Sequence, residues 1–232
     1  MSQETIGTAV IGGGMMGIAT ALALARAGVR DITIFEARDH LGGLSDAYSW
    51  NGLTWDRFYH VVLSTDHNTL DFLAELGLAE DVFWRETETG FYRDGRLVPM
   101  SSIADFIRFP FLTLWAKFRL GMGILHASRL GKLEKLDRIY VREWLTRIFG
   151  RRVFEELWDP LLRSKLGSAR DRTSAAFMWA TIRRLYGARS GEQKVERMGH
   201  VRGGYARIVE TAARALEEAG VTVRLEEPVA AL

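Results

Sequence analysis

The sequence has 232 residues, of which 47% are hydrophobic and 26% are charged, the proportions of an ordinary globular protein. It contains no cysteine, which excludes disulfides, thiolate metal sites and cysteine nucleophiles. No uncharged apolar run approaches about 18 residues, so we expect no membrane-spanning helix. We also expect no signal peptide, because the charged residue before the first apolar run is Glu4 rather than Lys or Arg.

The net charge is only +2, but it is unevenly distributed along the chain. Residues 101–195 contain 19 Lys and Arg against 9 Asp and Glu, whereas the rest of the chain is acidic. This asymmetry indicates that the middle segment faces a lipid surface or an acidic substrate, unless its basic residues belong to solvated helix faces. The basic residues are not interleaved with an aromatic platform for bases, so we expect no nucleic-acid partner.

The first 36 residues predict a β-α-β unit. Residues 8–11 are β-branched and apolar, residues 15–27 are rich in Ala and Leu and are followed by Gly28, and residues 31–35 read DITIF. A unit of about 30 residues is the size of a right-handed crossover between two parallel strands.

A G-x-G-x-x-G pattern lies between the predicted strand and helix of this unit. Gly12 permits a tight turn, Gly14 lets the backbone approach a pyrophosphate, and Gly17 lets the helix pack closely. Glu36 ends the second strand, where a carboxylate accepts both ribose hydroxyls and repels the 2′-phosphate of NADP. Strand, helix and acidic residue together favour a dinucleotide site over a simple glycine-rich turn.

The sequence between the β-α-β unit and the C-terminal region predicts hairpins and then helices. Asn51-Gly52 and Asp94-Gly95 are strong hairpin turns, and residues 64–78 predict an amphipathic helix between them. Residues 101–186 read as helical almost throughout, and residues 187–194 read as a loop.

The sequence of the C-terminal region again predicts alternating helices and strands. Residues 204–220 predict a helix, and the stretches VTVRL and PVAAL, residues 221–225 and 228–232, predict strands. The fold class is therefore α/β, a Rossmann-like FAD/NAD(P)-binding domain interrupted by a mostly helical substrate domain. We expect the first part of the binding domain at 1–65, the helical domain at 66–195 and the return at 196–232.

The stretch EARDHLGG, which begins at Glu36, carries a family resemblance. It resembles the E-A-R-x-x-x-G-G signature of the FAD-dependent amine oxidase, protoporphyrinogen oxidase and phytoene desaturase superfamily. In that superfamily the glycine pair, here Gly42-Gly43, lies against the FAD diphosphate and ribityl chain. The next family position is usually Arg, but Leu44 stands there, which fits the protoporphyrinogen-oxidase-like and mutase-like branches better than the amine oxidases proper.

The resemblance implies a set of FAD contacts beyond the motif itself. It places Tyr59 and His60 beside the isoalloxazine ring and the backbone of Val229 beside the adenine, although His60 could equally be a structural histidine. The implied cofactor-binding residues are Gly12, Gly14, Met15, Met16, Gly17, Glu36, Ala37, Arg38, Gly42, Gly43, Leu44, Tyr59, His60 and Val229.

The resemblance also implies that the family's fold continues beyond the Pro-Val strand, with a Gly-Asp segment that this sequence lacks. We therefore expect residues 1–232 to bind FAD at least tenfold more weakly than an extended chain, a loss of ~1.4 kcal/mol. We also expect an exposed apolar edge along residues 229–232.

Residues 106–129 mix aromatic and basic side chains. This composition suits an interfacial membrane helix, and it also suits a buried helix with a basic edge. The arginines of this region could also bind substrate carboxylates. The five histidines are scattered and form no H-x-x-x-H pair, so we expect no metal site.

These observations predict an FAD-dependent oxidoreductase similar to protoporphyrinogen oxidase, in which a lipophilic or acidic small-molecule substrate gives a hydride to the flavin. The alternatives are a flavin-dependent mutase-like isomerase and a non-catalytic FAD-binding fragment. We expect a cytoplasmic protein, with residues 106–129 as the candidate for peripheral membrane contact. The catalytic residues and the oligomeric state are not determined by the sequence.

Overall fold

The computed structural model describes residues 6–58, 60–88, 90–100, 102–131, 133–189 and 197–230. It divides into two compact units, each with its own hydrophobic core. Unit 1 comprises residues 1–62, 66–85 and 199–232, and unit 2 comprises residues 63–65 and 86–198.

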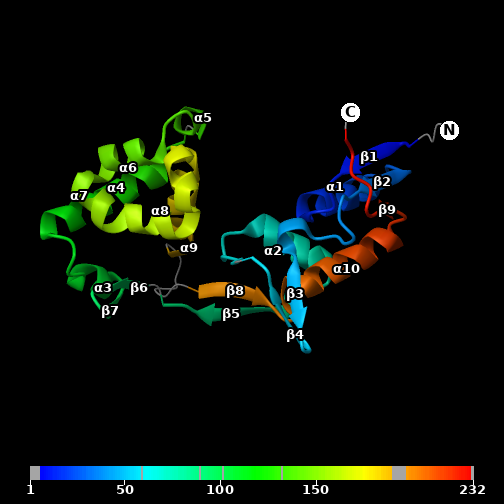
Figure 1. The fold of residues 1–232 in the computed structure, drawn as a ribbon, viewed down its shortest axis with the longest axis horizontal. Helices are drawn as coiled ribbons and strands as arrows, with labels where there is room; N and C mark the ends of the chain where they lie inside the picture. Colours follow the sequence, from blue (N-terminus) through cyan, green and yellow to red (C-terminus); the bar gives the residue numbers. More distant parts are fainter. Residues whose placement is uncertain are drawn as a thin grey trace. The chain divides into compact units, whose positions relative to one another are not determined.

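Unit 1 is built on a parallel sheet of three strands in the order β1-β2-β9 (Figure 1). Its strands are β1 (Thr8–Ile11), β2 (Ile32–Phe35) and β9 (Thr222–Arg224). The register pairs Val10 with Ile34, and Ile34 in turn with Val223. Because β2 is the central strand, its first three residues are buried, which explains its unbroken β-branched sequence.

Two helices pack with this sheet: α1 (Met15–Arg26) and α10 (Gly204–Glu218). Ile18 and Ala21 of α1 meet Ala212 and Leu216 of α10 in the same buried cluster as Ile34. The β-α-β unit expected from the first 36 residues is therefore present, with α1 as its crossover.

The chain after β9 differs from the expectation of a strand at residues 228–232. Its described part, 228–230, is irregular. Glu226 has a left-handed φ of 58°, and the N–H groups of Glu226 and Glu227 donate to the carbonyls of Arg38 and Glu36. Pro228 has no N–H to offer a sheet. The predicted strand is therefore wrong over residues 228–230, because these hydrogen bonds hold the chain against the loop after β2, and residues 231–232 lie outside the described residues.

Both predicted hairpin turns are present, in different units. Asn51 and Gly52, with φ of 48° and 77°, join β3 (Ala47–Trp50) to β4 (Leu53–Asp56) in unit 1. Asp94 and Gly95, with φ of 52° and 75°, join β6 (Gly90–Arg93) to β7 (Arg96–Pro99) in unit 2. Positive φ at both turn positions is the geometry that Asn-Gly and Asp-Gly favour.

Helix α2 (His67–Glu75) belongs to unit 1, whereas residues 66–85 were expected in the helical domain. Leu73 of α2 is fully buried in a cluster with Leu78, Val201 and Ile208, and this packing explains the difference.

The chain leaves unit 1 at β5 (Val82–Glu86) and returns at β8 (Arg197–Val201). These two strands, which the sequence reading missed, pair with each other.

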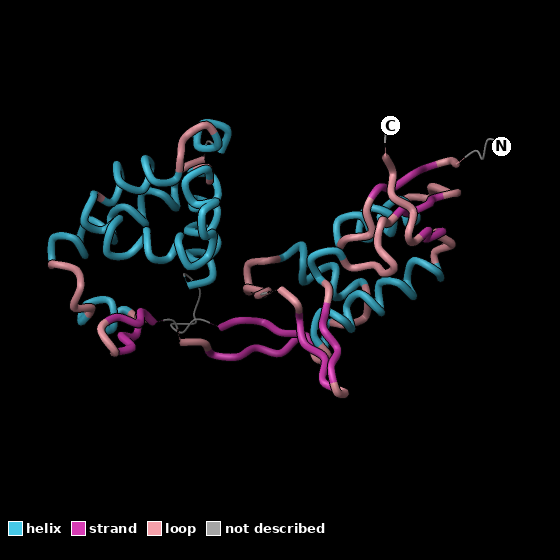
Figure 2. Tube along the Cα trace, in the orientation of Figure 1, coloured by secondary structure: helices cyan, strands magenta, loops and turns pink. Residues whose placement is uncertain are grey.

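Unit 2 is mostly helical, as Figure 2 shows by colour. Its α-helices are α3 (Ile103–Arg108), α4 (Leu114–Arg129), α5 (Leu133–Asp137), α6 (Val141–Phe149), α7 (Arg151–Val153), α8 (Asp159–Leu166) and α9 (Ala175–Arg189). A π-helical turn, Phe154–Trp158, joins α7 to α8. Short 3-10 helices are Gly43–Ser45 and Ala79–Asp81 in unit 1 and Gly167–Arg172 in unit 2.

The core of unit 2 forms where α4, α6 and α9 pack together. Val141, Leu145 and Phe149 of α6 are almost inaccessible to solvent. The helices expected over residues 101–186 are thus present in the described part of that segment. Helix α9 continues to Arg189, so residues 187–189 are helical where a loop was expected, and residues 190–194 of that expected loop lie outside the described residues. None of the helices in the described part of the chain is long and apolar enough to cross a membrane.

Candidate functional site

The first glycine loop lies at the carboxyl end of β1 and leads directly into α1. Gly12 has a φ of 95°, a conformation that only glycine adopts readily, and its N–H donates to the carbonyl of Phe35 at 2.8 Å. At Gly17, an added Cβ would lie 1.9 Å from the carbonyl oxygen of Gly12. The two glycines therefore allow the tight turn and the close approach of α1 that the pattern predicts.

Gly14 is the N-cap of α1, and no side chain caps this helix. The first turn of α1 contains no acidic residue, so no side-chain carboxylate offsets the positive end of the helix dipole, which lies at its free N–H groups. A Cβ on Gly14 would have only the Cα of Gly43 within 4 Å, at 3.9 Å. The protein's own packing does not need a glycine here, whereas a phosphate seated on the helix N-terminus would.

Glu36 lies immediately after β2 and is 91% buried, with 9% of its surface exposed. Its Oε2 accepts the N–H of Gly13 at 2.6 Å, and its Oε1 accepts the N–H of Arg38 at 2.9 Å. Burial by itself would raise the pKa of Glu36, but the backbone N–H groups of Arg38, Gly13 and Ala37 outweigh it and lower the pKa. The carboxylate is therefore ionised at neutral pH, and each oxygen keeps a lone pair for a ribose hydroxyl.

The second glycine loop lies against the first. Gly42 has a φ of 120° and donates its N–H to the carbonyl of Gly13 at 2.9 Å. Gly43, with a φ of 59°, comes so close to Gly14 that an added Cβ would lie 3.0 Å from the Cα of Gly14. The structure thus brings together two of the glycine motifs that the sequence singled out, backbone against backbone.

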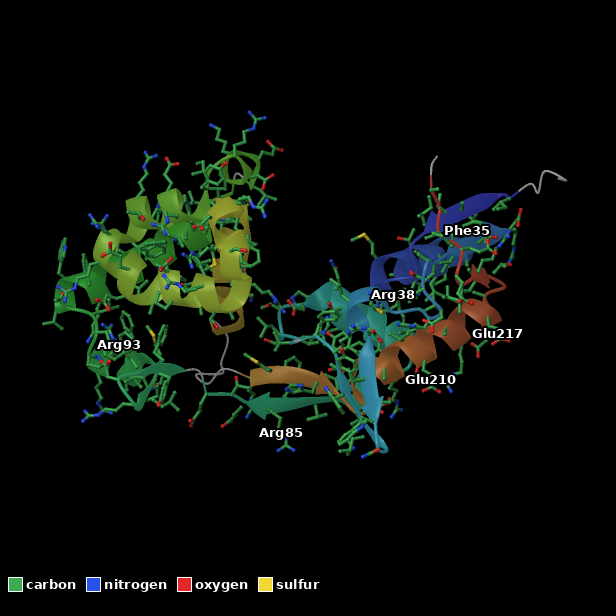
Figure 3. The ribbon with its side chains drawn as sticks, in the orientation of Figure 1. Phe35, Arg38, Arg85, Arg93, Glu210 and Glu217 are labelled. Carbon is green, nitrogen blue, oxygen red and sulfur yellow. The ribbon has the colours of Figure 1, made fainter. Side chains whose placement is uncertain are left out.

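Asp46 ties the second glycine loop to its neighbours. Its carboxylate accepts Arg57 Nη1 at 2.9 Å and the N–H of Ala47 at 2.8 Å, and Arg38 Nη1 lies 3.5 Å away. The hydrogen bond from Arg57 is the main reason that the pKa of Asp46 is lowered, against a smaller opposing effect of burial. Figure 3 labels Arg38, together with Phe35 at the end of β2.

The remaining expected contacts near the loops differ in exposure. Met16 and Leu44 are 85% and 72% exposed, so both side chains are accessible on the surface of unit 1. Met15 is partly buried and packs against the core. Ala37 is exposed beside Glu36.

His60 and Val229, the two remaining expected FAD contacts that the structure describes, lie outside the two glycine loops. His60 Nδ1 is 2.8 Å from the carbonyl oxygen of Phe58, and its ring lies beside the ring of Tyr205 of α10, with the centroids 4.3 Å apart and the planes tilted by 31°. These are the contacts of a positioned histidine, and none of them joins it to the glycine loops. Val229 is 40% exposed and follows the segment that is hydrogen-bonded to residues 36–38. Tyr59 lies outside the described residues.

Three residues at the site were not singled out from the sequence. Gly13, the middle glycine of the GGG run, donates its N–H to Glu36, and an added Cβ there would lie 2.4 Å from the end of the Leu41 side chain, which would have to move. The uninterrupted GGG run was the available signal. Asp46 and Arg57 are charged residues in a stretch of sequence that predicts a loop and a hairpin. They pair across 11 positions, and no local sequence pattern indicates this ion pair.

Taken together, the described residues fit a dinucleotide better than a mononucleotide or a metal. The uncapped N-terminus of α1 suits a phosphate, and the ionised Glu36 suits a ribose without a 2′-phosphate. The second glycine loop adds further backbone next to the first loop, where a diphosphate would lie. Among the described residues, no group of three His, Asp or Glu side chains could hold a metal ion.

Comparison with known proteins agrees with this geometry. Residues 15–232 match the family model described as flavin containing amine oxidoreductase. The mitochondrial protoporphyrinogen oxidase of Nicotiana tabacum is 30% identical over 175 residues, which cover 72% of this chain and 34% of that protein. The chain thus spans about a third of the length of this relative.

Solved structures show the same fold at lower identity. A proposed protoporphyrinogen oxidase from Exiguobacterium sp. 255-15 superimposes with a TM-score of 0.65 at 23% identity, covering 98% of this chain and 54% of that one. Reduced UDP-galactopyranose mutase gives a TM-score of 0.61 at 20% identity, covering 95% and 49%. The family match over nearly the whole chain leads to one conclusion: this chain belongs to the family of flavin-containing amine oxidoreductases, and its cofactor is FAD.

Proposed function

We propose that this chain forms the adenosine- and diphosphate-binding part of an FAD-dependent oxidoreductase of the protoporphyrinogen oxidase kind. The observation that carries the proposal is the pairing of the two glycine loops around an ionised Glu36. The 30% identity to the tobacco enzyme over 72% of the chain supports the choice of branch.

Each residue in the proposal has a separate task. Glu36 accepts hydrogen bonds from the adenosine ribose, and Gly14 and the first turn of α1 face the diphosphate. Gly42 and Gly43 bring the second loop against the same group, while Asp46 holds that loop through Arg57. When bound, the flavin supplies the redox chemistry by accepting a hydride from the substrate.

Unit 2 is proposed as the substrate domain. It is a helical insertion with a core of its own, between two stretches of unit 1. Its excess of arginine suits a substrate with carboxylates, because guanidinium groups bind carboxylates through two parallel hydrogen bonds. We infer a lipophilic or acidic small molecule as the substrate class.

The proposal is tested with the FAD-loaded chain under anaerobic conditions. Mixing with protoporphyrinogen should bleach the absorbance of the oxidised flavin, and readmitting oxygen should restore it. The control uses the same chain mixed with protoporphyrin, the product, which should leave the flavin oxidised. If the substrate leaves the flavin spectrum unchanged while FAD stays bound, oxidase activity of this chain is contradicted, and the alternative of a non-catalytic FAD-binding fragment is supported.

A second candidate function is a flavin-dependent isomerase, favoured by the fold shared with reduced UDP-galactopyranose mutase and by Leu44 in the position where the resemblance expects Arg. This candidate predicts turnover of UDP-galactopyranose only after the flavin is reduced with dithionite, without net consumption of the reductant. Turnover by the oxidised protein, or none after reduction, would remove it.

A further inference from the structure

Helix α10 begins at a pair of glycines that offer no side chain to cap it. Gly203, the N-cap, has a φ of 85°, and Gly204, the first residue of the helix, has a φ of 68°. The first turn of α10 contains no acidic residue either. Because the first N–H groups of a helix have no acceptor within the helix, those of α10 depend on acceptors from other parts of the fold.

Asp56, the last residue of β4, supplies such an acceptor across 149 sequence positions. Its Oδ1 accepts the N–H of Tyr205 at 2.8 Å, the hydrogen bond that an N-cap side chain usually makes. An added Cβ on Gly204 would lie 2.9 Å from the same Oδ1, so a side chain there would displace the carboxylate. Asp56 therefore fixes the start of α10 against the end of β4, which it contacts (Figure 1).

One turn further along, α10 contacts the second glycine loop. Val209 follows Tyr205 by four residues and therefore lies on the same face of the helix. An added Cβ on Gly42 would lie 3.2 Å from Cγ2 of Val209, so the helix side chain closes on the backbone of the loop. Gly42 in turn donates its N–H to the carbonyl of Gly13. The position of α10 thus bears directly on how the two glycine loops meet.

The residue after Asp56 holds the second loop from its other end. Arg57 donates its backbone N–H to the carbonyl of Asp46 at 2.9 Å, in addition to the ion pair with the carboxylate of Asp46. The 3-10 helix just before Asp46 has little packing of its own, because Ser45 is buried but Leu44 is exposed. The end of β4 therefore holds the second glycine loop on both sides, through α10 and through Asp46.

We propose that Asp56 is a positioning residue for the FAD diphosphate. By capping α10 it holds Val209 against Gly42, and the second glycine loop in turn keeps its place against the first. The effect is preorganisation of the backbone that receives the diphosphate, which lowers the free-energy cost of binding without any contact between Asp56 and the cofactor. The inference rests on the proposed function in one respect, that the paired glycine loops bind the diphosphate.

Isothermal titration of the full chain with FAD tests the proposal. The D56A variant lacks the acceptor and should bind FAD about tenfold more weakly, because part of the preorganisation is lost. The D56N variant keeps an Oδ1 acceptor and should bind FAD like the unmodified chain. The matched control is T113A, which removes the side chain that accepts the N–H of Ala116 at the start of α4 in unit 2 and should leave the affinity unchanged.

Hydrogen exchange of the FAD-free chain gives a second readout, which does not depend on the cofactor. D56A and V209A should each accelerate exchange of the Gly42 N–H. The D56A/V209A double variant should add little to either single change, because both act through the same contact. Faster exchange at Tyr205 alone would show that Asp56 caps α10 without positioning the loop, and this result would overturn the proposal.

The affinities give three further ways to overturn it. D56A binding FAD as tightly as the unmodified chain, D56N binding as weakly as D56A, or T113A weakening FAD binding as much as D56A would each do so. Circular dichroism confirms that every variant is folded at the temperature of the titration. If the unmodified chain binds no FAD, the proposed function fails, and exchange of the Gly42 N–H still decides whether Asp56 positions the loop.

Discussion

Glu36 accepts the N–H groups of Gly13 and Arg38, so a single side chain joins the first glycine loop to the segment after β2. The two hydrogen bonds use half of the roughly four acceptor positions of a carboxylate. The lowered pKa keeps the group charged, which favours ribose hydroxyls and disfavours a 2′-phosphate. The same residue thus organises the loop and remains available for the cofactor.

Replacing Glu36 with Ala should weaken FAD binding by about 1–3 kcal/mol, because charged hydrogen bonds to the ribose are lost. Isothermal titration of the purified chain with FAD measures the effect. The control is Glu75→Ala in α2, which removes an exposed carboxylate paired with Arg26 in the same unit and should leave the affinity unchanged. Equal FAD affinities for the two variants would exclude Glu36 from the site.

At the scale of elements, the start of α1 depends on how closely a helix can approach the loop before it. An added Cβ on Gly17 meets the carbonyl oxygen of Gly12 at 1.9 Å, which is backbone and cannot rotate away. Gly121 in α4 has no atom within 4 Å of its added Cβ, although it is also a helical glycine. One glycine is required by packing, and the other is not.

Gly17→Ala should therefore lower the free energy of unfolding by about 3 kcal/mol, through the displacement of α1 or of the loop. Gly121→Ala should raise the free energy of unfolding by about 0.5–1 kcal/mol, because alanine has the better helix propensity. Urea unfolding followed by circular dichroism measures both changes. A Gly17→Ala variant as stable as Gly121→Ala would show that α1 tolerates a side chain at this position.

At the scale of the whole molecule, each of the two units has its own main hydrophobic core, and these two cores share no buried residue among those described. Leu216 on α10 is fully buried in unit 1, and Leu145 on α6 is fully buried in unit 2. Unit 1 is assembled from segments that are more than 100 residues apart in the sequence. Its integrity therefore depends on the return of the chain through β8 and α10.

Leu216→Ala and Leu145→Ala should each destabilise their own unit by about 2–5 kcal/mol, the usual result of leaving a cavity in a core. Added FAD should raise the melting temperature of the transition that Leu216→Ala lowers, because a ligand stabilises the unit that binds it. Differential scanning calorimetry with and without FAD measures this. Protection by FAD of only the transition lowered by Leu145→Ala would place the cofactor on unit 2.

The sequence by itself determined the features that depend on neighbouring residues. The β-α-β unit, the positive φ of Gly12 and the turns at Asn51-Gly52 and Asp94-Gly95 follow from local sterics and side-chain periodicity. The helical nature of the described part of 101–186 follows from the same periodicity. The family resemblance also came from a short contiguous motif, EARDHLGG, and the family match supports it.

Only the tertiary structure decided the features that depend on distant residues. The pairing of β5 with β8 and the place of α2 in unit 1 require contacts across more than 100 positions, for which no local pattern exists. The segment after β9 reads as a strand, but hydrogen bonds to Arg38 and Glu36 hold it outside the sheet. The exposure of Trp115 and Phe118, which is 71% and 59%, was likewise undecided, because an aromatic residue on a helix is buried or exposed according to what packs against each face.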